Sequence, residues 1–234
     1  MDKALVISGA SRGIGRTTAE KFLAEGYRVI NLSRTDPQLN AVEHVGVDFS
    51  DINWANQCQQ QLLAAVGEPE QLTVIHNSGQ LYKDRVDSLE PDALHQVLQV
   101  NLVASLQLNQ MILPLMKPGS SIIYVGSTLS EKAVANACSY VVSKHAVAGL
   151  MRATCQDLAG SGIHTTCVCP GFTETEMLRD HVGESQEVLD IIASGVTFGR
   201  LIEPREIAET LFFCASQPVI NGSVIHANLG QIET

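Results

Sequence analysis

The stretch ALVISGASRGIG, residues 4–15, decides the fold class. It begins with a short apolar run, which is typical of a buried strand, and continues into Gly9, Gly13 and Gly15, spaced GxxxGxG before a helical pattern. Glycines let the backbone turn sharply and approach a ligand closely, and the helix that follows offers free N–H groups and a positive dipole end. The combination predicts a phosphate-binding turn at the first strand–helix junction of an α/β protein.

Short β-branched runs alternate with longer helical patterns along the rest of the chain. The runs are continuously apolar, as expected for strands whose sheet is covered on both faces. The predicted strands are 4–8, 28–32, 44–48, 72–77, 121–125, 163–169 and 223–226. The predicted helices are 14–25, 54–66, 91–115, 136–159, 184–194 and 204–215. This order predicts an α/β Rossmann fold, a doubly wound parallel sheet of about seven strands with helices on both faces.

No linker or change of composition divides the 234 residues, so a single domain spanning 1–234 is predicted. Residues 172–199 interrupt the alternation between the sixth and seventh strands. Because loops beyond the carboxyl ends of strands carry the ligand sites of such sheets, we expect this insertion to form a substrate lid. The sequence leaves open whether that lid is ordered without a ligand.

Composition and charge disfavour several classes of protein. The chain is 45% apolar, which argues against disorder, and no apolar run approaches the roughly 20 residues of a membrane helix. With 15 Lys and Arg against 25 Asp and Glu, the net charge is −10. That charge disfavours nucleic acid and anionic membrane surfaces as partners.

The cysteines and the first residues indicate a reducing compartment. A basic segment followed by a long apolar run, which would mark secretion, is not found at the beginning, so a cytoplasmic protein with reduced thiols is expected. Cys167 and Cys169 share one face of a predicted strand, but no second Cys or His pair at a zinc-binding spacing accompanies them. No metal site is predicted.

The end of the second predicted strand indicates the cofactor. In dinucleotide-binding folds an acidic residue near this point holds the ribose 2′-OH of NAD, whereas a nearby arginine accommodates the 2′-phosphate of NADP. Here Ser33 takes the acidic position and Arg34 follows, while Arg12 in the glycine turn can face the same phosphate. We therefore predict NADP(H); the nearby Asp36 weighs against this choice.

The positions of a tyrosine, a lysine and a serine indicate a catalytic site. Tyr140 and Lys144 are four residues apart in a predicted helix and therefore share a face. An ammonium group near a phenol favours phenolate, and moving a tyrosine pKa from about 10 toward 7 needs roughly 4 kcal/mol. Ser127 follows the fifth strand, where its hydroxyl can hold a substrate oxygen beside Tyr140. Alone such a Tyr–Lys pair is more often a surface pair; with Ser127 and the glycine turn it predicts catalysis.

Together these motifs resemble the classical short-chain dehydrogenase/reductase family over essentially the whole chain. HNSG at 76–79 resembles the family's Asn-Asn-Ala-Gly, with departures at His76 and Ser78, and VNL at 100–102 resembles the segment of the fourth catalytic residue. The resemblance implies four catalytic residues, Asn101, Ser127, Tyr140 and Lys144. It implies cofactor contacts from Gly9, Ser11, Arg12, Gly13, Ile14, Gly15, Ser33, Arg34, Asp48, Phe49, Asn77, Ser78, Gly79, Tyr140, Lys144, Pro170, Gly171, Thr173 and Thr175.

By that resemblance the reaction is hydride transfer between nicotinamide C4 and a carbonyl or alcohol carbon. Tyr140 acts as general acid or base and Ser127 stabilises the developing oxyanion. Lys144 lowers the tyrosine pKa and binds the nicotinamide ribose, and Asn101 holds a water that links Lys144 to solvent. The direction and the stereochemistry of the reaction stay open.

The substrate is the least specified feature. PGFTETEM at 170–177 and FGRL at 198–201 resemble the 3-oxoacyl-acyl-carrier-protein reductase branch, which handles an acidic carrier with basic residues. In the matching stretches KPGS at 117–120 and GSGI at 160–163 only Lys117 is basic, and Ser161 stands where a cation would be useful. A charge of −10 also repels an acidic carrier. We expect a small or medium, neutral to apolar carbonyl or alcohol, with a carrier-bound substrate as the alternative. The expected pocket residues are Leu129, Val134, Cys138, Phe172 and Met177.

An alternative of another class is a non-catalytic NADP-sensing protein on the same fold. Such proteins usually lack the tyrosine or the lysine, and both are present here. The family commonly assembles through the helices that carry Asn101 and Tyr140 and through the last strand, so a homodimer or homotetramer is expected.

Overall fold

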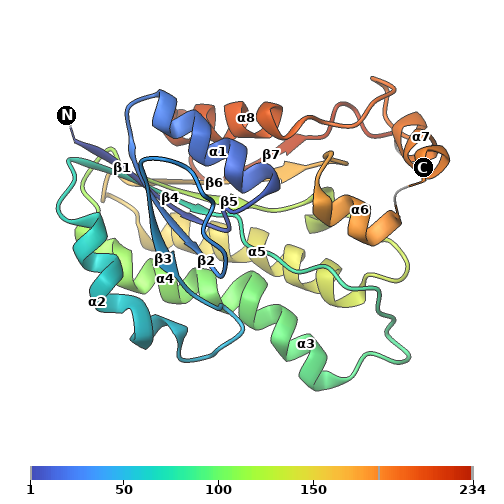
Figure 1. Cartoon of the computed structure of the whole chain (residues 1–234), viewed down its shortest axis with the longest axis horizontal. Coiled ribbons are helices and arrows are strands. Elements are labelled where there is room, and N and C mark those ends of the chain that lie inside the picture. The colour runs from blue at the N-terminus through green and yellow to red at the C-terminus, as the bar shows by residue number, and fades with distance from the viewer. Residues whose placement is uncertain (1, 184, 233–234) are drawn as a thin grey trace.

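The computed structural model describes residues 2–183 and 185–232. Seven parallel strands form one sheet in the order β3-β2-β1-β4-β5-β6-β7 (Figure 1). The strands are β1 Lys3–Ser8, β2 Arg28–Ser33, β3 Val42–Gly46, β4 Gln71–His76, β5 Ser121–Val125, β6 His164–Pro170 and β7 Ser223–Ala227. The predicted doubly wound α/β sheet is therefore confirmed.

Helices cover both faces of the sheet, as predicted. The α-helices are α1 Gly13–Ala24, α2 Trp54–Val66, α3 Pro91–Leu98, α4 Ala104–Ile112, α5 Cys138–Asp157, α6 Glu176–Val182, α7 Gln186–Ser194 and α8 Pro204–Ser216. Figure 1 shows α1 and α8 on one side of the sheet and α2, α4 and α5 on the other. None of the helices within the described residues has the length and apolar character needed to cross a membrane.

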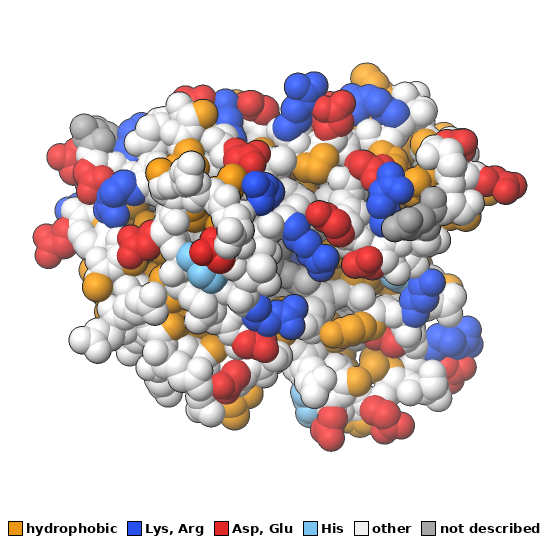
Figure 2. Space-filling view, in the orientation of Figure 1, with side chains coloured by type: hydrophobic (Ala, Val, Ile, Leu, Met, Phe, Trp, Pro, Cys, Tyr) orange, Lys and Arg blue, Asp and Glu red, His pale blue; other side chains and the backbone are white. Residues whose placement is uncertain are grey.

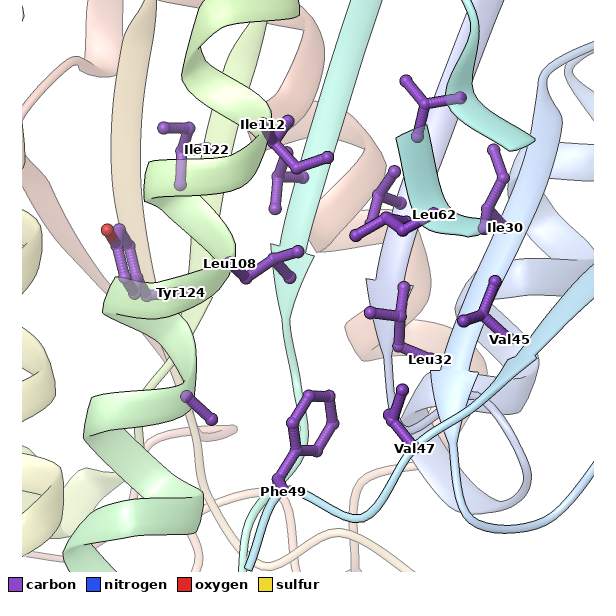
Figure 3. Close-up of a cluster of buried hydrophobic side chains, with 14 of the residues drawn as sticks. Ile30, Leu32, Val45, Val47, Phe49, Leu62, Leu108, Ile112, Ile122 and Tyr124 are labelled. Atoms are coloured by element: carbon purple, nitrogen blue, oxygen red, sulfur yellow. The ribbon is translucent and has the colours of Figure 1, made fainter. Parts of the chain in front are cut away.

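Alternate residues of each strand supply the two cores. In β1, Ala4 and Val6 belong to the core on the side of α2, α4 and α5, whereas Leu5 and Ile7 belong to the core beneath α1 and α8. Figure 3 shows part of the first core, where Leu62 and Leu108 approach the apolar side chains of the sheet. Continuous apolar strands arise because each face buries its own half of the side chains.

The order of the strands reverses between β1 and β4. From β1 the chain first builds β2 and β3 on one side and then crosses over to build β4 to β7 on the other. In open α/β sheets a crevice forms at the carboxyl ends of the strands at this point, and ligands bind there. The glycine turn follows β1, and the HNSG segment begins at the end of β4. The fold thus brings two of the sequence motifs to one end of the sheet.

The helix predicted over 91–115 is wrong as a single helix. The chain instead forms α3, a π-helix (η1, Gln99–Val103), α4 and a 3₁₀ turn (η2, Leu113–Leu115). The π-turn contains Asn101, whose side chain makes three hydrogen bonds outside the helix. Such turns are frequent at functional sites, and the apolar periodicity of the sequence does not reveal them.

Other corrections concern boundaries and one missing helix. Strand β3 lies at Val42–Gly46, two residues before the predicted 44–48, and α5 starts at Cys138 because Asn136 has a left-handed backbone with φ 64°. The segment 172–199 contains α6, which was not predicted, as well as α7. The predicted start of the α7 region, Glu184, lies outside the described residues.

Candidate active site

In the glycine turn the backbone of Gly15, at the start of α1, packs directly against the backbone of Gly9. A side chain at Gly15 would begin 2.1 Å from the carbonyl oxygen of Gly9, so helix α1 packs against the turn only if Gly15 has none. Asn77 secures the turn from the end of β4, because its Nδ2 donates to the carbonyl oxygens of Ser8 and Gly9 at 3.1 and 3.0 Å. Helix α1 begins at Gly13 without a side-chain cap, which leaves its first N–H groups free to bind an anion.

Asn31 holds the other side of the glycine turn and was missed in the sequence. It is fully buried in β2, and its Oδ1 accepts a hydrogen bond from Ala10 N at 2.8 Å. Its Nδ2 lies 2.9 Å from Ser33 Oγ and 3.0 Å from His44 Nδ1. A polar residue in the middle of the apolar run RVINLS is the signal that points to this role.

Two of the predicted cofactor residues lie at a pocket of about 310 Å³ beside β2 and β3. Arg34 and Asp48 line it, together with residues of α2. Hydrogen bonds from the backbone N–H and hydroxyl of Ser50 are the main cause that lowers the pKa of Asp48, and the positive charge of Arg34 adds to the effect. Ser33 is buried and its hydroxyl donates to Thr35 O, so Arg34 is the exposed group of this strand end.

Two further predicted cofactor residues have partners in the protein. The ring of Phe49 is buried and packs edge-on against Trp54, with ring centroids 4.8 Å apart. Arg12 is exposed and forms a 3.9 Å ion pair with Asp180 of α6. The structure therefore pairs Arg12 with the predicted lid segment.

Tyr140, Lys144 and Asn101 come together beside Gly79. Lys144 is buried, its Nζ donates to Val125 O at 2.7 Å, and the same atom lies 5.5 Å from the centre of the Tyr140 ring. A side chain at Gly79 would begin 3.8 Å from Lys144 Nζ and 3.7 Å from Asn101 Oδ1. Gly79 therefore lies next to both the amide oxygen and the ammonium group.

Asn101 is held firmly by its own bonds. Its Nδ2 donates to Gln80 O at 3.0 Å and to Ser143 Oγ at 2.9 Å, and its Oδ1 accepts from Gln80 N at 2.7 Å. The π-turn gives the side chain this orientation toward α5. Asn101 thus connects the segment after β4 to the helix that carries Tyr140.

Ser127 lies two residues beyond Val125, to which Lys144 is bonded. Its Oγ accepts a hydrogen bond from Leu129 N at 3.1 Å and caps a 3₁₀ turn (η3, Thr128–Ser130). Within the described residues its hydroxyl hydrogen has no acceptor, so it can donate to a substrate oxygen.

The buried thiols of Cys167 and Cys169 pack against Gly126, the residue before Ser127. Their sulfur atoms are 3.8 Å apart, and a side chain at Gly126 would begin 2.8 Å from each. A hydrogen bond between the thiols, together with burial, raises the pKa of Cys167, and the same bond lowers the pKa of Cys169. Residues 2–183 and 185–232 contain no group of three or more His, Cys, Asp or Glu side chains arranged to hold a metal.

His76, a departure from the family's motif, lies in a buried polar chain below the site. Its Nε2–H donates to Asn109 Oδ1 at 2.8 Å, and Asn109 Nδ2 donates to the Tyr124 hydroxyl at 2.6 Å. Burial lowers the pKa of His76 to about 4, although the bond to Asn109 acts in the opposite direction. His76 is therefore neutral at pH 7.

The turn after β6 brings the predicted nicotinamide-side residues over the glycine turn. Thr173 Oγ1 donates to Gly171 O at 3.0 Å, and Thr175 caps α6 by accepting from Leu178 N at 3.3 Å. A side chain at Gly13 would begin 3.2 Å from the methyl group of Thr175. The start of the predicted lid segment therefore covers the start of α1.

The predicted pocket residues differ in exposure. Leu129, Cys138, Phe172 and Met177 are half-buried, whereas Val134 is 52% exposed in the loop before α5.

Known proteins of one family match nearly the whole chain. The family model described as enoyl-(acyl carrier protein) reductase matches residues 9–231. The 3-oxoacyl-[acyl-carrier-protein] reductase FabG of Vibrio harveyi is 28% identical and covers 97% of this chain and 96% of its own length. Carbonyl reductase family member 4 of Xenopus laevis is 25% identical, with 96% of each protein covered.

Solved structures agree with these relatives. The ligand-free aldohexose dehydrogenase of Thermoplasma acidophilum has a TM-score of 0.90 and 26% identity, over 98% of this chain and 93% of that one. The fold, the motifs and the extent of these matches lead to one conclusion: the chain belongs to the short-chain dehydrogenase/reductase family of oxidoreductases, near the branch of the 3-oxoacyl-acyl-carrier-protein reductases.

Proposed function

We propose that this protein is an NADP(H)-dependent oxidoreductase that interconverts a carbonyl and an alcohol, with Tyr140 as the general acid or base. The observation that carries the proposal is the buried Lys144, whose Nζ lies 5.5 Å from the centre of the half-buried Tyr140 ring. This arrangement places a positive charge over the ring of the proposed acid or base. The bond from Lys144 to Val125 O keeps the cation in the site.

The residues of the crevice fit a dinucleotide. The close approach of Gly9 and Gly15 and the uncapped N-terminus of α1 suit a pyrophosphate, and Gly79 lies beside Lys144. When bound, the nicotinamide supplies or accepts the hydride. The chain itself then has to orient the substrate, stabilise its oxygen and move one proton.

Each catalytic side chain has a separate task in this scheme. The Tyr140 hydroxyl gives its proton to the carbonyl oxygen in the reductive direction and takes it back in the oxidative one. Ser127 donates its hydroxyl hydrogen to the same oxygen, since its Oγ already accepts from Leu129 N. Lys144 stabilises the tyrosinate, and the bonds of Asn101 to Gln80 fix the segment after β4 against the helix turn that carries Asn101.

Two features favour NADP over NAD. Arg34 is exposed at the pocket after β2, where it can pair with a 2′-phosphate, and Ser33 leaves this position without an acidic side chain. Thr35 O already accepts the hydrogen of the Ser33 hydroxyl. The cation therefore sets the preference.

A small or medium, neutral to apolar carbonyl is the proposed substrate. Half-buried Leu129, Phe172 and Met177 give the expected pocket an apolar lining. A 3-oxoacyl group on an acyl carrier protein is the second candidate, favoured by the 28% identity to the Vibrio harveyi reductase over 97% of this chain.

A carbonyl-panel assay with Tyr140→Phe tests the proposal. Wild-type protein should oxidise NADPH with at least one carbonyl, and Tyr140→Phe should lower kcat by about 10²–10⁴-fold while still binding NADPH. Tyr27→Phe, which keeps the ring that packs on Phe22 before β2, is the matched control and should keep full activity. Turnover that survives in Tyr140→Phe would rule out this mechanism. NADPH binding by the wild type without turnover on any carbonyl would support a sensing protein instead.

The same proposal includes a homodimer or homotetramer. Val103 and Leu106, near and on α4, and Val142 on α5 are 36%, 44% and 43% exposed, so both helices present apolar side chains that a second copy can cover. Sedimentation of wild type and Leu106→Glu compares the assemblies: a smaller species is expected for the variant, and a monomeric wild type would refute the assembly.

A further inference from the structure

The helix that carries Tyr140 and Lys144 has no cap of its own. The N-cap position of α5 is Ala137, whose methyl side chain cannot accept a hydrogen bond. The preceding residues 131–136 are all exposed, so this loop contributes little packing. A helix N-terminus in such a position needs a hydrogen-bond acceptor from another part of the chain.

Asp84 supplies that acceptor from the segment between β4 and α3. Its Oδ1 accepts a hydrogen bond from Ser139 N at 2.9 Å, across 55 residues of sequence, and its Oδ2 accepts from the Ser139 hydroxyl. Its backbone N–H donates to Asn136 O at 3.2 Å, and its carbonyl accepts from Cys138 N at 3.4 Å. Both carboxylate oxygens and both backbone groups of Asp84 therefore bind the start of α5.

The same segment is tied to the cofactor side of the crevice at its other end. Asn77 bonds the glycine turn, and both backbone polar groups of Gln80 bond the side chain of Asn101. Asn101 also donates to Ser143 Oγ on α5. Residues 77–84 thus form a strap that joins the glycine turn, the π-turn and the first turn of α5.

We propose that Asp84 is a positioning residue, which holds the start of α5 so that Tyr140 faces the reacting carbonyl. Tyr140 directly follows Ser139, the residue that donates both hydrogen bonds to the carboxylate. A carboxylate at this end of a 20-residue helix also interacts favourably with the helix dipole. The inference rests on the proposed role of Tyr140, and it adds a residue that does not touch the substrate.

Three variants test the position of Tyr140. Asp84→Ala removes both side-chain acceptors and should lower kcat about ten- to a hundredfold, since small misplacements of a catalytic group have effects of this size. The KM for NADPH should change less than about threefold, because the glycine turn keeps its bonds to Asn77 and Asn31. Asp84→Asn retains an acceptor for Ser139 N and should recover most of the loss. Asp87→Ala, in the same loop but bonded to Arg85 and Ser88 rather than to α5, is the control and should behave as wild type.

Hydrogen exchange of the peptide covering 138–146 gives a readout that does not need turnover. Exchange should become faster there in Asp84→Ala, with no change in β1, and should stay as in wild type in Asp87→Ala. If the wild type is active and Asp84→Ala keeps the full kcat, the inference is overturned. Should Asp84→Ala not fold, Ser139→Ala deletes the hydroxyl bond alone; a lower kcat is expected and an unchanged kcat overturns the inference.

Failure of the proposed function gives a different pattern. In that case wild type, Asp87→Ala and Asp84→Ala would all be inactive on every carbonyl while NADPH still binds. The exchange data then test by themselves whether Asp84 holds the start of α5. Faster exchange confined to 138–146 in Asp84→Ala supports this role, and unchanged exchange overturns it.

Discussion

Arg34 is the single side chain on which the proposed cofactor preference depends most. It is exposed at the rim of the pocket beside β2 and β3, and replacing it with alanine removes a cation from the expected 2′-phosphate position. Arg34→Ala should weaken NADPH binding by about 1–3 kcal/mol, roughly 5- to 150-fold in Kd, and change NADH binding little. Fluorescence titration with both cofactors measures this. Arg205→Ala, at an exposed arginine of α8, is the control, and equal weakening of both cofactors by Arg34→Ala would contradict the assignment.

His76 makes stability depend on pH in a known direction. Burial lowers the pKa of His76 to about 4 in the folded state, against 6.5 for the ordinary side chain. Between these values the unfolded chain binds a proton that the folded chain does not, so stability is complete above pH 6.5 and falls as the pH drops toward 4. The loss from this group reaches about 3 kcal/mol.

Urea unfolding at several values between pH 7 and pH 4.5 tests the effect of His76. His76→Gln has no group that titrates in this range, so its free energy of unfolding should fall less steeply with acid than that of wild type. Parallel pH curves for the two proteins would show that His76 is not the cause.

The residues proposed to bear chemistry follow from local sequence patterns, whereas their supporting partners do not. Tyr140 and Lys144 follow from helical spacing and Gly15 from the glycine pattern, since these signals are local in sequence. Asn31 and Asp84 act through partners 21 and 55 residues away, and no local pattern shows such a bond. The site is therefore positioned by tertiary hydrogen bonds. The polar residues that make them look like ordinary strand or loop residues in the sequence.

At the scale of elements, strand positions followed from apolar runs to within about two residues. Helix α2 lies at the predicted 54–66, because its apolar face is regular. The interruption of the long helix at Gln99–Val103 escaped prediction because the bonds of Asn101 to Gln80 and Ser143 select the π-turn. Helix α6 escaped because it has only seven residues and depends on the Thr175 cap.

The packing of α1 against α8 gives a stability prediction at this scale. Phe22 of α1 is fully buried, and its ring centroid lies 4.9 Å from that of Tyr27 and 5.1 Å from that of Phe212 on α8. Phe22→Ala should lower the free energy of unfolding by about 3–5 kcal/mol, since the cavity cannot fill. Phe213→Ala, at a 53% exposed residue of the same α8, should change it little. Equal losses in denaturant unfolding of the two variants would mean that this contact does not stabilise the pair.

At the scale of the whole molecule, net charge gives the two proposed substrates different expected behaviour. On the face in Figure 2, blue and red side chains are interspersed and no large patch of one sign is visible. The net charge of −10 therefore acts on an approaching acidic carrier mainly as long-range repulsion. The three cations with proposed local tasks, Arg12, Arg34 and Lys144, serve a small anionic cofactor instead.

This repulsion predicts how rates depend on salt. For a 3-oxoacyl group on an acidic carrier protein, kcat/KM should rise when ionic strength increases from about 0.01 to 0.15 M, because the Debye length shrinks from about 30 to 8 Å. The same acyl group on a small neutral thiol should show no such rise, so the ratio of the two values isolates the carrier. NADPH is kept saturating, since its own binding weakens with salt. A carrier-bound substrate whose kcat/KM is higher than that of the small thioester and falls with salt would reveal attraction to a local group of cations. That result would make the carrier-bound acyl chain the physiological substrate, in place of the free carbonyl proposed here.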